Sequence, residues 1–220
     1  MKLGAVVFDV DGTLYPNRMM YTRSIPFFLR YPRLVLSFGR VRKKLRGIRP
    51  VEDFYGLQAE LLAEEMKIST EKAGNLVDKT IYRIWENVLK NVKIFPGLRE
   101  LLHDLETRGI KRALLSDFPI GKKMAILNLD VDWDMAASAE DVGYLKPNPE
   151  PFLYVADKLG LPVQRILYVG NHYEYDILGA GKVGMKTAHL SRGGRDGTVA
   201  DFTFASYTEL HRKLIDTGYI

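Results

Sequence analysis

Two carboxylates stand one residue apart at the end of an apolar run near the N-terminus. The run covers residues 5–8, and Asp9 and Asp11 follow it directly, ahead of Gly12. Because alternate side chains of a strand share a face, Asp9 and Asp11 leave the strand end together. Two carboxylates this close repel each other unless a cation or a shared proton compensates them. The pattern therefore predicts a chemical site, although a simple acidic turn after a strand would fit the same residues.

Further polar residues follow other segments that we expect to be buried. Ser116 ends the apolar segment 113–115, and Asn171 and Asp176 come shortly after a second one at 165–169. Lys146 lies in the loop sequence Gly-Tyr-Leu-Lys-Pro-Asn-Pro. In an open parallel sheet the carboxyl ends of the strands lie along one edge, so these side chains can converge there. Taken singly, a serine at a strand end or one lysine is usually structural or solvated.

The elements that must position these residues alternate between strand and helix from residue 94 onward. We expect strands at 113–115, 165–169, 186–190 and 200–204, in addition to 5–8. Helices are predicted between Gly97 and Gly109 and at 149–159, 177–183 and 206–215. This alternation predicts a doubly wound α/β fold, which is a parallel sheet with right-handed crossovers.

The segment between the first strand and residue 93 has a different pattern. Helical spacing of leucines marks 56–66, and Ser69 is a plausible N-cap for a second helix. We therefore expect an all-helical insertion at 15–92. The α/β core would then comprise residues 1–14 and 93–220.

Composition excludes several classes of protein. The 220 residues include no cysteine, so neither a disulfide framework nor a thiolate metal site is possible. No uncharged apolar stretch approaches the ~18 residues that a membrane span needs, and the first strand leaves no room for a signal peptide. We expect a cytoplasmic protein. The net charge of +5 favours anionic ligands without identifying one.

The segment Asp9-Val10-Asp11-Gly12-Thr13 resembles the first motif, D-x-D-G-T, of the haloacid dehalogenase (HAD)-like hydrolases. Ser116, Lys146 and the run from Gly170 to Asp176 match the other three motifs of that superfamily in order. The resemblance covers nearly the whole chain. It implies a HAD-like, Rossmann-type core with an α-helical cap inserted after the first motif. Asp11 places the chain with the phosphatases of this superfamily, because the dehalogenase branch lacks an aspartate there.

The resemblance implies a catalytic role for each carboxylate. Asp9 would be the nucleophile that attacks phosphorus and forms an aspartyl-phosphate. Asp11 would protonate the leaving oxygen and then act as base toward the hydrolytic water.

The resemblance also implies residues that bind the phosphoryl group. Ser116 would donate a hydrogen bond to a phosphoryl oxygen, and the backbone N–H of Asp117 would be a second donor. Lys146 would offset the charge of Asp9 and of the transferring group. Gly12 and Thr13 complete the expected substrate-binding set.

The fourth motif departs from the usual pattern. The family usually has G-D-x-x-x-x-D, whereas here Asn171 stands where the first of these aspartates is expected. The implied Mg²⁺ ligands are Asp9, Asp11, Asn171 and Asp176. An amide oxygen still suits this hard cation, but one negative charge is lost, so metal affinity should fall.

A basic stretch inside the insertion allows three interpretations. Residues 12–51 contain no acidic residue and ten basic ones, interleaved with aromatic and leucine side chains. They could form a solvated face over packed apolar residues. One or two of the arginines could instead reach across the site and clamp a second anionic group of the substrate. Attraction to an anionic membrane or to nucleic acid is the third interpretation, which no motif supports.

Together these features predict a Mg²⁺-dependent phosphatase that hydrolyses a small phosphate monoester through an aspartyl-phosphate. The expected partner is a small phosphorylated metabolite, with no nucleic acid and no stable membrane association. A phosphomutase of the same superfamily shares all four motifs and stays an alternative. A catalytically weak substrate-binding or interaction protein is a second alternative, motivated by Asn171.

Overall fold

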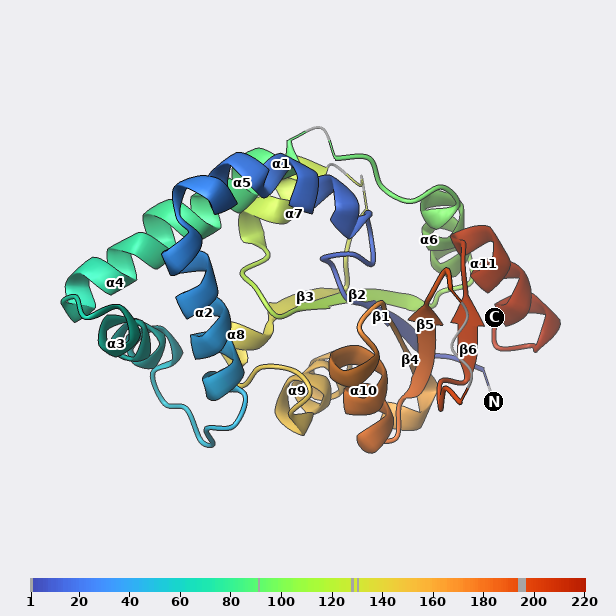
Figure 1. Ribbon diagram of the computed structural model, residues 1–220. Coiled ribbons are helices and arrows are strands. Elements are labelled where there is room, and N and C mark those ends of the chain that lie inside the picture. The colour runs from blue at the N-terminus through green and yellow to red at the C-terminus, as the bar shows by residue number, and fades with distance from the viewer. Residues whose placement is uncertain (1, 91, 128, 130, 194–196) are drawn as a thin grey trace.

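A six-stranded parallel sheet forms the centre of the molecule (Figure 1). The computed structural model describes residues 2–90, 92–127, 129, 131–193 and 197–220. The strand order is β3-β2-β1-β4-β5-β6, and every neighbouring pair is parallel. The strands are β1 Ala5–Phe8, β2 Lys111–Ser116, β3 Met135–Ser138, β4 Ile166–Gly170, β5 Lys186–Leu190 and β6 Phe202–Phe204. The predicted doubly wound α/β fold is confirmed.

Strand β1 is central and is buried on both faces. Val7 pairs with Ala113 of β2 on one side and with Tyr168 of β4 on the other. The side chains of Val6 and Phe8 join the apolar core on one face of the sheet, and those of Ala5 and Val7 join the core on the other. A strand with two buried faces needs a continuous apolar run, which residues 5–8 provide.

Helices cover both faces of the sheet. On one face lie α6 (Leu98–Thr107) and α11 (Tyr207–Asp216), which bury leucines at helical spacing. On the other lie α9 (Pro149–Leu159) and the short α10 (Gly179–Lys182). The remaining helices of the core are α7 (Gly121–Leu127) and α8 (Ala139–Val142). Across the residues that the structure describes, no helix is long and apolar enough to cross a bilayer.

From residue 17 to residue 89, every regular element is helical. Figure 1 shows these helices arching over one side of the sheet, with α2 running down toward α8. They are α1 Asn17–Arg30, α2 Pro32–Leu45, α3 Phe54–Met66, α4 Thr70–Leu76, a π-helical turn Val77–Tyr82 and α5 Arg83–Leu89. Ser69 caps α4 as predicted, since its hydroxyl accepts a hydrogen bond from the Lys72 N–H.

Several elements differ from the expectations, among them the helices α7 and α8, which were not predicted. Strand β3 was not predicted, because Met-Ala-Ala-Ser carries no β-branched or aromatic side chain. The helix expected at 177–183 starts earlier, as a π-helical turn over Tyr173–Leu178 that continues into α10. This early start brings Asp176 back against the end of β4, as described below.

Candidate active site

The turn after β1 directs Asp9 and Asp11 away from the sheet. The Asp9 N–H still donates to the Val169 carbonyl at 2.9 Å, so Asp9 continues the sheet pairing. Gly12 follows with φ +88°, in the left-handed region that favours glycine. A Cβ at this position would lie 2.3 Å from Asn17 Nδ2 and 2.7 Å from Asn171 Nδ2. The turn therefore needs glycine for its conformation and for the close approach of two amide side chains.

Asp9 is nearly inaccessible and contacts both a cation and a hydroxyl. Its Oδ1 accepts a hydrogen bond from Lys146 Nζ at 2.8 Å, and its Oδ2 accepts one from Thr13 Oγ1 at 2.8 Å. Burial raises the pKa of Asp9 to about 7; Lys146 opposes this rise, while Asp176 and Asp11 add to it. The ionised form of Asp9 thus needs further positive charge to be favoured at neutral pH.

Lys146 lies between two buried carboxylates. Its Nζ is 2.8 Å from Asp9 Oδ1 and 2.7 Å from Asp176 Oδ1, and it also donates to the hydroxyl of Tyr168 at 3.0 Å. Burial alone would lower the pKa of Lys146, but the two carboxylates outweigh it and hold the pKa well above the ordinary value. Lys146 is therefore a fixed cation beside Asp9.

Asp11 has partners of its own. Its Oδ2 is 2.5 Å from Lys123 Nζ and accepts a hydrogen bond from Ser116 Oγ at 3.3 Å, and its Oδ1 accepts one from the Tyr15 hydroxyl. Burial raises the pKa of Asp11, yet the Lys123 ammonium and the hydrogen bonds outweigh burial and leave the pKa below its ordinary value. The two carboxylates at the end of β1 thus differ: the pKa is raised for Asp9 and lowered for Asp11.

The end of β2 brings Ser116 and Asp117 to the same edge. Ser116 is fully buried, and its Oγ accepts a hydrogen bond from the Phe118 N–H at 3.1 Å, so the loop folds back over the hydroxyl. The Asp117 carboxylate accepts the Lys146 N–H at 3.0 Å. Asp117 therefore ties the loop after β2 to the backbone of Lys146.

The end of β4 supplies Asn171 and Asp176. Asn171 Oδ1 accepts a hydrogen bond from Thr13 Oγ1 at 3.1 Å, which places the amide beside the Asp9 turn. Asp176 is 1% exposed, and its Oδ2 accepts the His172 N–H at 2.9 Å while its Oδ1 holds Lys146. The structure thus brings together Asp9, Asn171 and, through Lys146, Asp176.

The oxygen atoms offered at this edge suit Mg²⁺. Asp9 Oδ2 and Asn171 Oδ1 both lie within hydrogen-bond distance of the Thr13 hydroxyl, so an oxygen of each faces the same point. Carboxylate and amide oxygens are ligands that Mg²⁺ accepts, and one or two carboxylates plus substrate phosphate commonly hold it. In the described part of the chain, no group of three or more His, Cys, Asp or Glu side chains is arranged to hold a metal ion. The side chains at this edge that offer oxygen ligands are Asp9, Asp11, Asn171 and Asp176. All three carboxylates also pair with lysines, Asp9 and Asp176 with Lys146 and Asp11 with Lys123.

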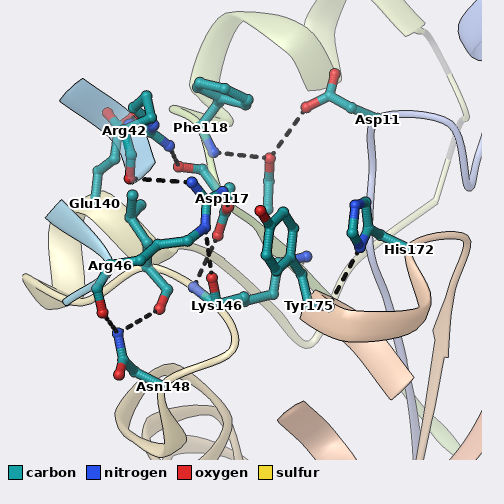
Figure 2. Close-up of polar contacts among 12 residues, drawn as sticks. Asp11, Arg42, Arg46, Asp117, Phe118, Glu140, Lys146, Asn148, His172 and Tyr175 are labelled. Carbon is teal, nitrogen blue, oxygen red and sulfur yellow. Dashed lines mark hydrogen bonds and ion pairs between the residues drawn. The ribbon is translucent and has the colours of Figure 1, made fainter. Parts of the chain in front are cut away.

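Arg42 of α2 and Arg46, the residue directly after α2, reach the site from the helical segment (Figure 2). Arg42 contacts the Glu140 carboxylate and donates to the Asp117 carbonyl at 2.8 Å, with its guanidinium 4.3 Å from the Phe118 ring centroid. Arg46 donates to Asp117 Oδ2 at 2.6 Å and to the Lys146 carbonyl at 2.9 Å. The basic stretch therefore contacts the loop after β2, at Asp117, and the loop of Lys146, and two carboxylates of the protein, Asp117 and Glu140, balance its charge.

Lys123 is the functional candidate that the sequence patterns missed. It belongs to α7, a helix that was not predicted, and no motif marks it among the 32 basic residues. Its side chain is 5% exposed, so its ion pair with Asp11 lies out of bulk water. Only the packing of α7 beside the end of β1 reveals it.

A pocket of about 420 Å³ opens above Asp9. The charged groups Asp9, Asp11, Asp117, Lys146 and Asp176 line it from the sheet edge, and side chains of α1 and α2 line it from the helical segment. A pocket with charged groups at one end and a volume in this range is typical of a small-molecule site.

Comparisons with known proteins agree with the sequence motifs and the fold. A sequence model described as a haloacid dehalogenase-like hydrolase matches residues 3–184. A glyceraldehyde 3-phosphate phosphatase of Methanopyrus kandleri is 26% identical over 204 residues, which are 86% of this chain and 84% of that protein. Pyrophosphatase PpaX of Halalkalibacterium halodurans is 29% identical, over 86% of this chain and 83% of its own.

A solved L-2-haloacid dehalogenase shares the fold. Its TM-score is 0.72 at 18% identity, and the match covers 98% of this chain and all of the other. At this identity the likeness bears on the fold. Among the curated relatives most are named phosphatases or pyrophosphatases, which supports a phosphatase function, and one is named a haloacid dehalogenase.

Proposed function

This chain belongs to the haloacid dehalogenase-like hydrolase family, and we propose that it is a Mg²⁺-dependent phosphatase that acts on a phosphate monoester through an aspartyl-phosphate at Asp9. The observation that carries the proposal is the contrast at the end of β1. The Asp9 carboxylate lies 2.8 Å from the fixed cation Lys146. Asp11, two residues further along the chain, pairs instead with Lys123. This contrast supports an attacking role for Asp9 and a proton-transfer role for Asp11.

In the first half-reaction, a carboxylate oxygen of Asp9 attacks phosphorus in line with the ester oxygen. The Asp9 O–P bond forms as the P–O bond to the alcohol breaks, and the leaving oxygen takes the proton of Asp11. Lys146 and the Ser116 hydroxyl offset charge on the transferring group. The alcohol leaves, and Asp11 remains ionised.

In the second half-reaction, water attacks the phosphorus of the aspartyl-phosphate. Asp11 accepts a proton from this water, the Asp9 O–P bond breaks, and inorganic phosphate leaves. Asp9 is then free and Asp11 carries a proton again, so the cycle closes. The low pKa of Asp11 makes it a weak base in water, but its position next to the reacting phosphorus compensates by proximity.

Asp11 must hold a proton in the first half-reaction, and its ion pair with Lys123 opposes this. The 2.5 Å contact favours ionised Asp11, which is the form needed for the second half-reaction. Lys123 is therefore a positioning residue that sets the balance between the acid and base roles of Asp11.

Asp9, Asp11, Asn171 and Asp176 would hold Mg²⁺. When bound, this ion supplies positive charge that favours ionised Asp9 and offsets the charge of the phosphoryl oxygens. The neutral amide of Asn171 contributes an oxygen without a charge, which predicts weaker metal binding than a carboxylate at this position would give.

The test is phosphate release from a panel of phosphorylated metabolites and p-nitrophenyl phosphate, with Mg²⁺ and with EDTA. EDTA-sensitive release supports the proposal. Transfer of phosphate between two positions of a sugar, with none released, would identify a phosphomutase instead. Chloride release from 2-chloropropionate without phosphate release would assign the chain to the dehalogenases, and silence in every assay would favour a binding protein.

A further inference from the structure

The pocket above Asp9 has two walls of opposite character. Charged side chains line the sheet edge, as described above. The facing wall comes from α1 and α2 and is mostly apolar, comprising Met20, Tyr21, Phe28, Val35 and Phe38. A ligand that fills this pocket meets charge at one end and hydrocarbon at the other.

The helical wall also carries a few polar groups, but they do not change the difference between a charged end and an apolar end of the pocket. Asn17 lies beside the Gly12 turn, at the charged end. Ser24 is small and 2% exposed. Arg42 and Arg46 are the cations of this wall. Sugar hydroxyls would therefore meet few hydrogen-bonding partners on this wall.

Both arginines already have anionic or carbonyl partners within the protein. Arg42 contacts Glu140 and also donates to Gln58 at 3.2 Å. Arg46 contacts the Asp117 carboxylate, and its guanidinium lies 4.2 Å from the Tyr175 ring centroid. A second anionic group on the substrate would have to compete with these partners. The phosphate position used here, beside Asp9 and Lys146, is therefore the one that the proposed phosphatase reaction supplies.

The apolar wall continues onto the molecular surface. Tyr21 is 60% exposed although it lines the pocket, and Ile25 and Leu29 follow it on α1 at 51% and 78% exposure. Residues four apart on a helix lie on the same face, so these three form one stripe that runs outward from the pocket. A ligand longer than the pocket can extend along this stripe.

We propose that the substrate is an amphiphilic phosphate monoester, with its phosphate at Asp9 and Lys146 and an apolar body, an alkyl chain or an aromatic ring, against Phe28, Val35 and Phe38. This inference rests on the phosphatase function proposed above. It separates this chain from relatives whose names specify small polar phosphates, such as glyceraldehyde 3-phosphate.

The experiment compares ethyl, butyl, hexyl and octyl phosphate, with phenyl phosphate as the ring analogue and glycerol phosphate as the polar one. Each methylene buried on the apolar wall should raise kcat/KM by about two- to fourfold. The gain should come mainly through KM, because this contact is made equally in the ground state and in the transition state. Glycerol phosphate should be the poorest substrate.

Variants on neighbouring positions of α2 locate the effect. Val35→Asn places an amide on the pocket wall and should lower the octyl-to-ethyl ratio of kcat/KM at least about tenfold. Leu36→Asn is the control, because Leu36 is 62% exposed and does not line the pocket; it should leave the ratio unchanged. Both substrates are measured on the same preparation, so the folded fraction of each variant cancels from the ratio.

The outcomes separate this inference from the proposed function. If kcat/KM does not change along the alkyl series, or is highest for glycerol phosphate, the proposal of an amphiphilic substrate is wrong, while the proposed phosphatase function is retained. If kcat/KM rises with chain length in the wild type, and Leu36→Asn removes this rise whereas Val35→Asn does not, then the apolar contact lies outside the pocket. The proposed contact with Phe28, Val35 and Phe38 would then be wrong. No release from any ester overturns both proposals.

Discussion

Lys123 of α7 and Asp11 at the end of β1 form an ion pair, with 2.5 Å between Nζ and Oδ2. This cation holds the pKa of Asp11 below its ordinary value, although burial acts in the opposite direction. A step that needs a proton on Asp11 slows as the pH rises past that pKa. Replacing Lys123 by methionine removes the cation and raises the pKa of Asp11, so the alkaline limb of the kcat–pH profile should move to higher pH.

The control for this profile is Lys122→Met, which removes an exposed cation from the same helix. Its profile should overlie that of the wild type. A Lys123→Met limb that stays in place, or moves to lower pH, would show that Lys123 does not govern the proton on Asp11.

The second prediction concerns the nucleophile. Asp9→Asn should lower phosphate release at least about a thousandfold, because loss of a nucleophile removes the covalent route. The side chain is similar in size and the turn at Gly12 does not depend on its charge, so far-UV circular dichroism should be unchanged. A variant with near-native turnover would exclude Asp9 as the attacking group.

The same substitution makes a prediction about stability against pH. The pKa of Asp9 is raised to about 7 from 3.8, so the folded protein keeps this proton between those values whereas the unfolded chain releases it. The stability contributed by protonated Asp9 is complete below pH 3.8 and is lost as the pH rises through 7. An asparagine at position 9 stays neutral, so the variant does not lose this stability as the pH rises.

Without metal, the melting temperature of Asp9→Asn should therefore exceed that of the wild type at pH 8 by at least ~2 °C, which corresponds to about 1 kcal/mol for a chain of this size. At pH 4 the two melting temperatures should be close. Melting curves in EDTA at the two pH values measure this difference. Asp157→Asn, which removes an exposed carboxylate from α9, should show no such pattern. If the melting temperature of Asp9→Asn minus that of the wild type is smaller at pH 8 than at pH 4, the raised pKa of Asp9 is contradicted.

A fourth prediction separates a buried ion pair from an exposed one on α2. The side chains of Arg42 and Glu140 are 5% and 0% exposed. Arg42→Met leaves a buried carboxylate without its cation and should lower the free energy of unfolding by about 3–5 kcal/mol. Arg40→Ala breaks the exposed pair with Glu65 and should cost less than ~1 kcal/mol. Urea unfolding of both variants measures the contrast; equal losses would refute it.

The fifth prediction concerns Asn171. Restoring a carboxylate by Asn171→Asp adds a negative charge beside Asp9 and should lower the half-saturating Mg²⁺ concentration about tenfold, equivalent to ~1.4 kcal/mol. Phosphate release titrated with Mg²⁺ gives this value. An unchanged titration would mean that the side chain at 171 does not face the metal.

The sequence predicted those parts of the site that depend on strand ends. A continuous apolar run specifies β1, and parallel pairing then brings the residues after β1, β2 and β4 to one edge, which placed Asp9, Ser116 and Asn171. The contact of Lys123 depends on how α7 packs, and no local pattern encodes that. Likewise, the sequence showed a basic stretch, but only the fold shows that Arg42 and Arg46 contact protein groups.

The pairing of β1 has a consequence for how the chain assembles during synthesis. Val7 leaves the ribosome early, but its neighbours in the sheet, Ala113 and Tyr168, emerge only after the whole helical segment and much of the core. Helices form from local contacts and can mature first, whereas such distant pairings close late and slowly. A nascent or truncated chain that ends before β4 therefore exposes an apolar strand with an open edge, and is the form most prone to aggregate and most in need of a chaperone.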